Sequence, residues 1–86
     1  MSNIKIIADH YGINPQLDQM QEECAELIVA INKHKRYGKS EQVIEEIADV
    51  ELMLEQLKYL LNCDGEVQKI KKQKIERQLD RIDWRA

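Results

Sequence analysis

Two six-residue segments place carboxylates at the same spacing: EECAEL at residues 22–27 and EEIADV at residues 45–50. Each segment has two adjacent acids, a gap of two residues, a third acid and then an apolar residue. Carboxylate oxygens are the ligands that Mg²⁺ and Mn²⁺ prefer, whereas zinc sites use mostly sulfur and nitrogen. One such acid pair is usually a solvated helix surface. The chemistry therefore depends on whether the fold brings the two segments together.

The composition favours a small all-α protein. Of the 86 residues, 43% are hydrophobic and 34% are charged, with one Pro, three Gly and no Phe. The net charge of −3 does not favour binding to nucleic-acid polymers. The two cysteines lack zinc-type spacing, and the sequence has neither a secretory segment nor an apolar run of transmembrane length. We therefore expect one cytoplasmic domain over residues 1–86, without a membrane partner.

Residues that typically begin or end helices divide the chain into four expected helices, over residues 3–11, 15–37, 41–62 and 65–82. Asparagine, serine and aspartate accept hydrogen bonds from the free N–H groups of a helix start, and proline fits the first helical position. The residues expected in these roles are Asn14, Ser40 and Asp64 as caps and Pro15 as a first residue. Glycine ends helices, and Gly12 and Gly38 stand at those points. The end of the chain, residues 83–86, is expected to be frayed.

The second and third helices place their acids at matching angles from their apolar stripes. At about 100° per residue, Glu23 and Glu26 lie roughly 60° and 120° to one side of Met20. Glu46 and Asp49 lie at the same angles, roughly 60° and 120°, from the start of the next stripe at residue 43. The stripes are Leu17, Met20, Cys24, Leu27 and Ile31 in one helix, and Val43, Ile47, Val50, Leu54, Leu57 and Leu61 in the other.

A short connection makes these two helices antiparallel neighbours. The local twofold of such a hairpin should bring Glu23, Glu26, Glu46 and Asp49 together across one groove. Four negative charges at close range repel one another, and a divalent cation resolves the conflict. Mg²⁺ is expected, and Mn²⁺ is possible. A di-iron site is disfavoured because it uses Glu-x-x-His pairs, and no histidine stands three residues after a glutamate.

The segment EECAE, followed about twenty residues later by EIAD, resembles the EExxE…ExxD signature of the MazG-type nucleoside triphosphate pyrophosphohydrolases. These enzymes belong to the all-α NTP pyrophosphatase superfamily, and the resemblance covers roughly residues 13–82. It implies Mg²⁺-dependent hydrolysis of a (deoxy)nucleoside triphosphate between the α and β phosphates, giving a nucleoside monophosphate and pyrophosphate. It also implies a homodimer, or a tetramer made of dimers, and the metal ligands Glu23, Glu26, Glu46 and Asp49.

A carboxylate that is not fully engaged by metal is expected to accept the proton of the attacking water, and Glu22 and Glu23 both fit this catalytic role. The resemblance favours Lys74 and Arg77, in the basic last helix, as contacts to the outer phosphates. The alternative for that helix is a solvated surface stabilised by ion pairs. Lys33 lies on nearly the same face as Glu26 and could also contact phosphate. The alternative there is an exposed lysine.

Gln16 and Gln19 lie near Glu23 on the second helix, where their amides could bind a base edge; the alternative is an inert helix surface. The third helix also has a second apolar set, Ile44, Ala48, Leu52 and Tyr59, on roughly its opposite side. A helix with two apolar faces packs each face against a different partner. We therefore expect a second subunit and a four-helix-bundle core formed by oligomerisation of the hairpin with its flanking helices.

Two other functions stay open. A non-catalytic helical adaptor would use the hairpin for assembly and the acids for solubility, and it would need no metal. A related pyrophosphohydrolase would act on another nucleotide, such as phosphoribosyl-ATP.

Overall fold

The computed structural model describes residues 2–84, which form four α-helices and no strand. The helices are α1 (Asn3–Tyr11), α2 (Ile13–Tyr37), α3 (Glu41–Leu60) and α4 (Asp64–Arg81). The prediction of an all-α chain is confirmed over these residues. Residues 85 and 86 of the end that was expected to be frayed lie outside the described part. Within residues 2–84, none of the helices combines the length and the apolarity that crossing a membrane requires.

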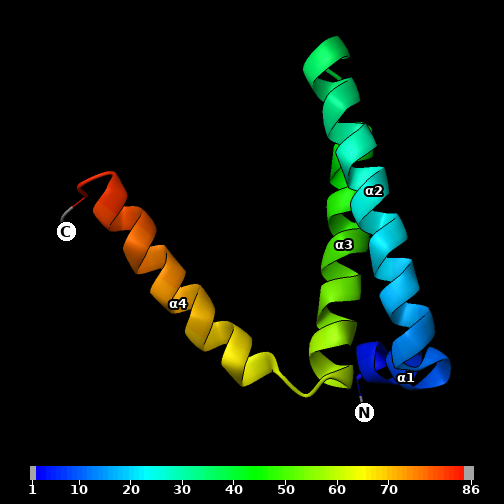
Figure 1. Ribbon diagram of the computed structural model, residues 1–86. Helices are drawn as coiled ribbons and strands as arrows, with labels where there is room; N and C mark the ends of the chain where they lie inside the picture. Colours follow the sequence, from blue (N-terminus) through cyan, green and yellow to red (C-terminus); the bar gives the residue numbers. More distant parts are fainter. Residues whose placement is uncertain (1, 85–86) are drawn as a thin grey trace.

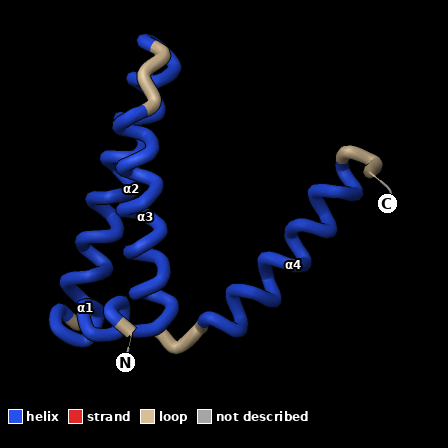
Figure 2. Tube along the Cα trace, turned by 180° about the vertical axis from the view of Figure 1, so that it is seen from behind, coloured by secondary structure: helices blue, strands red, loops and turns tan. Residues whose placement is uncertain are grey.

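The helices α2 and α3 form a long antiparallel hairpin, and α1 lies across its open end against both of them (Figures 1 and 2). The last helix, α4, leaves that same end and extends away from the hairpin (Figure 1). In the part of the chain that the structure describes, α4 contacts only α3. The acidic segments thus lie within the hairpin, whereas the basic helix stands apart from them.

The start of α2 differs from the prediction. The helix begins at Ile13, so Asn14 and Pro15 are its second and third residues, and Asn14 is not the cap. Gly12 takes the cap position with a φ of 82°, which glycine tolerates and which lets α1 pass directly into α2. Pro15 fits because N–H groups in the first turn have no partner within the helix. The Gln16 N–H then donates to the Gly12 carbonyl at 3.4 Å.

The connection between α2 and α3 follows the prediction in its backbone but not in its cap. Gly38 ends α2 in the left-handed conformation, with a φ of 74°, and its N–H donates to the His34 carbonyl. Ser40 directly precedes α3, but its hydroxyl is hydrogen-bonded with His34 Nδ1 at 3.4 Å instead of capping the helix.

The connection between α3 and α4 is longer than predicted, because α3 is shorter than predicted. The helix α3 ends at Leu60 rather than at Asn62, because Asn62 adopts a left-handed backbone with a φ of 51°. Asp64 is the first residue of α4 rather than its cap. Its carboxylate instead pairs with Lys58 at 3.4 Å, which holds the base of α4 against the end of α3.

The hairpin packs through a strip that is rotated from the predicted stripes. We call this strip the hairpin seam; its members are buried or half-buried. On α2 they are Gln16, Met20, Glu23, Leu27 and Ala30, and on α3 they are Val43, Glu46, Val50, Met53, Gln56, Leu57 and Leu60. The other members of the predicted stripes are exposed, namely Leu17, Cys24, Ile31, Ile47, Leu54 and Leu61. The rotation moves two glutamates from the edge of the packed face into it.

A hydrogen bond between two buried glutamines crosses the seam near α1. Gln16 Nε2 donates to Gln56 Oε1 at 2.6 Å, and the two residues are 6% and 5% exposed. Apolar contacts tolerate sliding, whereas a buried polar pair is satisfied at one alignment only. This bond therefore fixes the register of α2 against α3.

Gln16→Leu should destabilise the protein by about 1–3 kcal/mol, because it leaves the buried Gln56 amide without its partner. Urea unfolding measures the loss. The double variant Gln16→Leu/Gln56→Leu should recover most of it, since removing both partners together is nearly neutral. Gln21→Leu, at an exposed position of the same helix, is the matched control. A Gln16→Leu protein as stable as that control would contradict a role for the bond in holding the hairpin.

Candidate metal centre

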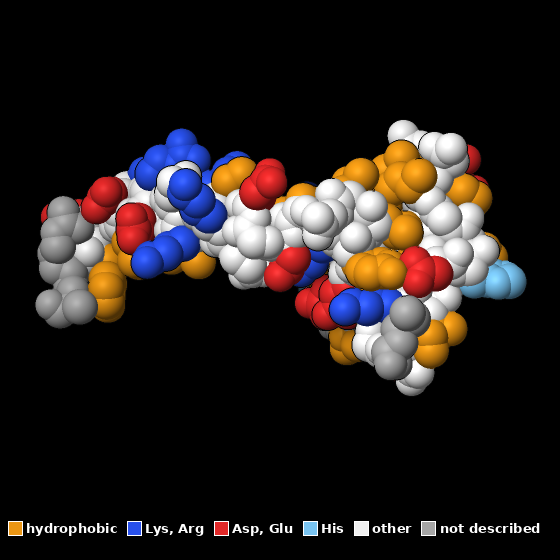
Figure 3. All heavy atoms as spheres, turned by 90° about the horizontal axis from the view of Figure 1, so that it is seen from below, with side chains coloured by type: hydrophobic (Ala, Val, Ile, Leu, Met, Phe, Trp, Pro, Cys, Tyr) orange, Lys and Arg blue, Asp and Glu red, His pale blue; other side chains and the backbone are white. Residues whose placement is uncertain are grey.

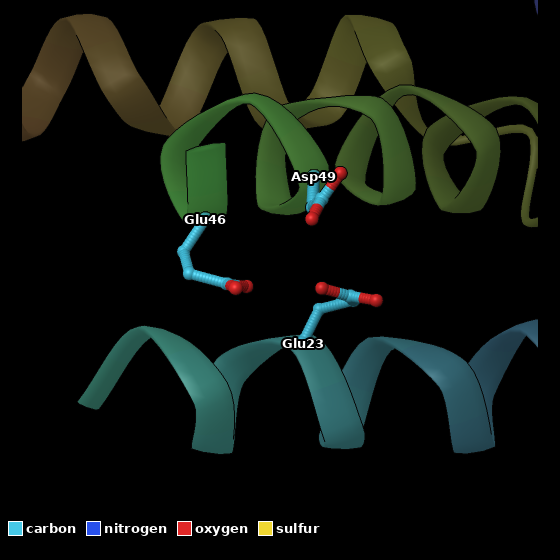
Figure 4. Close-up of side chains that lie close together, drawn as sticks. All are labelled: Glu23, Glu46 and Asp49. Atoms are coloured by element: carbon cyan, nitrogen blue, oxygen red, sulfur yellow. The ribbon is translucent and has the colours of Figure 1, made fainter. Parts of the chain in front are cut away.

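Three of the four predicted metal ligands meet between the helices of the hairpin. Glu23 on α2 and Glu46 and Asp49 on α3 each present a carboxylate oxygen, and within residues 2–84 these three atoms lie within 4.8 Å of one another. Figure 4 shows the three side chains converging on the space between the facing helices. We call these residues the carboxylate cluster. Two acidic segments that are distant in the sequence thus form one site.

Glu26, the fourth predicted ligand, lies outside the cluster but next to it. It lines a hollow of about 230 Å³ together with Glu46 and Lys33. Its negative charge also acts on Glu46, whose pKa it raises. The hollow therefore extends the cluster toward the turn of the hairpin.

The cluster is partly buried in the seam. Glu23 and Glu46 are half-buried, and Asp49 is exposed. The Oε2 atoms of Glu23 and Glu46 are buried, and neither has a hydrogen-bond partner within residues 2–84. Gln19 Nε2 donates to the other oxygen of Glu23 at 2.8 Å. Because buried polar atoms are normally paired, the two free oxygens have capacity for a ligand that the chain itself does not supply.

The electrostatics of the cluster oppose full ionisation. Partial burial raises the pKa of Glu46 above its ordinary value of 4.5, and the charges of Glu26, Asp49 and Glu23 raise it further. A cation would reverse these effects, because opposite charges favour the ionised carboxylate. The donors are all carboxylate oxygens, which fits Mg²⁺ or Mn²⁺ and not a soft metal.

Two further candidate residues lie beside the cluster, and a third does not fit its expected role. Gln19 donates a hydrogen bond to Glu23, and Lys33 lines the hollow with Glu26. Gln16, which was expected to bind a base, is buried in the seam and bonded to Gln56. Its amide therefore positions the helices and is not presented to a ligand.

The remaining candidates are not brought to the cluster within one chain. Glu22 is exposed on α2 and is not part of the cluster. Lys74 and Arg77 lie on α4, which extends away from the hairpin (Figure 1). A hollow of about 470 Å³ is lined by residues of α1, of the end of α3 and of the start of α4, and its lining includes Lys58 and Tyr59 but none of the candidate residues.

Sequence reasoning missed Gln56, although a signal for it was present. Gln16 and Gln56 are equally far from residue 36, and so are Glu23 and Asp49. The local twofold of the hairpin predicts that the acids meet, and it therefore also predicts that Gln16 and Gln56 meet, further from the turn than the acids.

Comparisons with protein-family models, with curated proteins and with solved structures find no match to this chain. The case for a function therefore stands on the cluster, the hairpin and the spacing of the acids.

Without metal, Glu46→Gln should be more stable than the wild-type protein at pH 7, because Gln removes a charge that the cluster disfavours. The pKa of Glu46 is raised in the folded state, so its contribution to stability is fully present below about pH 4.5 and is lost as the pH rises through the folded pKa. The advantage of Glu46→Gln should therefore fade as the pH falls toward 4.5. Thermal unfolding in EDTA between pH 4 and pH 8, roughly spanning that titration, measures it.

Glu45→Gln is the control for this comparison, because Glu45 is the exposed neighbour in the same helix. An equal gain at both positions would assign the effect to net charge alone. A loss of stability in Glu46→Gln at pH 7 would contradict repulsion within the cluster.

Proposed function

We propose that this protein is a Mg²⁺-dependent nucleoside triphosphate pyrophosphohydrolase of the MazG type. It would hydrolyse a (deoxy)nucleoside triphosphate between the α and β phosphates and release a nucleoside monophosphate and pyrophosphate. The observation that carries the proposal is the carboxylate cluster, in which acids from the EExxE and ExxD segments lie within 4.8 Å on facing helices. The two buried free oxygens add to it, because they fit a cation and not a purely solvated surface.

In this proposal Glu23, Glu46 and Asp49 hold Mg²⁺, with Glu26 beside them. Bound Mg²⁺ would supply charge neutralisation at the phosphate oxygens and a lowered pKa of the attacking water. An acidic groove repels a triphosphate unless such cations lie between them. This requirement favours a polyphosphate substrate that arrives with Mg²⁺ over a neutral one.

The chain's own residues would position the reactants. Lys33 lies on the hollow next to Glu26 and Glu46, where its ammonium group can contact a phosphate. Glu23 is favoured over Glu22 as the acceptor of the water's proton, because Glu22 lies outside the cluster. Gln19 holds one oxygen of Glu23, so the orientation of that carboxylate is set before a substrate binds.

The proposal includes a homo-oligomer, either a dimer or a dimer of dimers, with a four-helix core made of two hairpins. Its support is the apolar surface that the hairpin leaves exposed, which includes Leu17, Ile28 and Leu54. Of the second apolar set on α3, Ile44 and Leu52 are exposed, and the hydroxyl of Tyr59 donates to Asp9 Oδ1 at 2.8 Å and ties α3 to α1.

With Mg²⁺, a panel of ribonucleoside and deoxyribonucleoside triphosphates should include at least one that the protein converts to the monophosphate and pyrophosphate. Glu46→Gln and Glu23→Gln should each lower kcat/KM by at least about 100-fold. Glu22→Gln, from outside the cluster, is the matched control and should retain most activity. A panel that yields no pyrophosphate, while a known pyrophosphohydrolase is active in the same assay, would favour the adaptor function.

Mg²⁺ should stabilise the wild-type protein against unfolding, because it binds the folded state alone. At about 100 times its dissociation constant the gain is about 2.7 kcal/mol. Glu46→Gln should lose most of that gain even though it is the more stable protein in EDTA, whereas Glu45→Gln should keep it. Urea unfolding with and without Mg²⁺ gives both values. Equal stabilisation of all three proteins would place the bound ion elsewhere.

A further inference from the structure

The turn between α2 and α3 is strongly basic, although the chain as a whole has a net charge of −3. Residues 27–40 include four lysines and arginines and no acid, whereas the other 72 residues have nine basic and sixteen acidic residues. We call residues 33–40 the hairpin tip; it lies at the end of the hairpin opposite α1 and α4 (Figures 1 and 2). On α4, by contrast, six basic residues are interspersed with four acids, and Figure 3 shows the two kinds side by side along that helix. The net charge, which on its own disfavours binding to nucleic-acid polymers, therefore does not describe the hairpin tip.

The dipole of α2 explains only part of this charge. Cations near the C-terminus of a helix are stabilising, and Lys35 and Arg36 stand in the last turn of α2. Lys39 stands just before α3, where the dipole of that helix disfavours a cation. Within residues 2–84, none of the lysines and arginines of the tip forms an ion pair with a carboxylate. These cations are therefore free to bind a partner outside the chain.

Tyr37 places an accessible aromatic ring among these cations. It is 64% exposed, and the guanidinium carbon of Arg36 lies 6.0 Å from the centre of its ring. Two hollows, of about 110 and 310 Å³, share Tyr37 and Lys33 in their linings. Arg36 lines the smaller hollow and Lys39 the larger one. Each hollow thus combines the ring with two cations, which are the groups that bind the flat bases and the phosphates of a single strand.

Hydrogen bonds within the turn hold the two sides of the tip together. The N–H of Gly38 donates to the His34 carbonyl at 2.8 Å. The ring of His34 reaches across the turn, where its Nδ1 donates to the Lys39 carbonyl at 3.1 Å. The backbone of Lys39 is thereby fixed against the end of α2, next to Tyr37. An arrangement that is already formed loses less conformational entropy when a ligand binds.

We propose that the hairpin tip binds single-stranded nucleic acid, with Tyr37 stacked on a base. Lys33, Arg36 and Lys39 contact the phosphates around that base. A duplex does not fit this surface, because its bases are stacked on one another and present no free face to the ring. An anionic membrane fits it less well, because a lipid surface has no flat ring for Tyr37 and would meet the carboxylate of Glu41, which lines the larger hollow. The binding uses neither Mg²⁺ nor the carboxylate cluster, so it stands or fails separately from the proposed hydrolysis.

Fluorescence anisotropy with labelled oligothymidylate and oligouridylate of about 12 nucleotides measures the binding. EDTA in the buffer removes any ion that could bridge phosphates to the carboxylate cluster. Both strands should bind more tightly than a duplex of the same length. Raising the salt concentration from about 50 mM to about 200 mM should weaken the binding roughly 20-fold, as expected for three phosphate contacts. Equal binding of the duplex, no binding of either strand, or binding only to vesicles of phosphatidylserine and phosphatidylcholine would overturn the proposal.

Two matched pairs of variants test the contacts. Tyr37→Ala should weaken single-strand binding about 10-fold, whereas Tyr11→Ala, at a tyrosine that is 55% exposed at the other end of the hairpin, should leave it unchanged. Arg36→Glu should weaken binding more than Lys35→Glu, which makes the same change of charge at a residue that lines neither hollow. All four variants should keep their helical content by circular dichroism, because each replaces an exposed residue. Equal losses at Arg36 and Lys35, or no loss at Tyr37, would overturn the proposal.

Discussion

Like charges inside the packing interface of α2 and α3 are the constraint on which the rest of this structure depends. Glu23 and Glu46 occupy seam positions at which apolar side chains would pack without any desolvation of charge. Each has a buried oxygen that no group in residues 2–84 satisfies, and the pKa of Glu46 is raised in response. Sequences depart from the most stable choice chiefly at functional sites. This departure supports the metal-binding role that is proposed for the two glutamates.

Other contacts hold the helices in the alignment that this repulsion opposes. The bond between Gln16 and Gln56 fixes the register at one end of the hairpin, and Gln19 fixes one oxygen of Glu23. The hydroxyl of Tyr59 donates to Asp9, so α1 closes the same end. These contacts do not depend on a metal ion. In the proposed function, the carboxylates are consequently in place before an ion binds, and binding requires little rearrangement.

The meeting of Glu23, Glu46 and Asp49 could be predicted from the sequence because it depends on geometry that a short turn imposes. Equal angles from the apolar side and equal distances from residue 36 are sufficient for it. The packed face could not be predicted in the same way. Leu17 and Leu54 are as apolar as the residues that the seam uses, so a helical wheel does not rank the two sides. The direction of α4 depends on the backbone of Asn62, whose left-handed conformation no hydrophobic period encodes.

The separation of charge along the chain has a consequence for the site. Lys33 lines the hollow with Glu46, and a lysine or arginine that paired directly with Glu23 or Glu46 would compete with a metal ion. Placing Lys74 and Arg77 on a helix that leaves the hairpin prevents this pairing within one chain (Figure 1). In the proposed function, this separation leaves the carboxylates of the hairpin available to Mg²⁺.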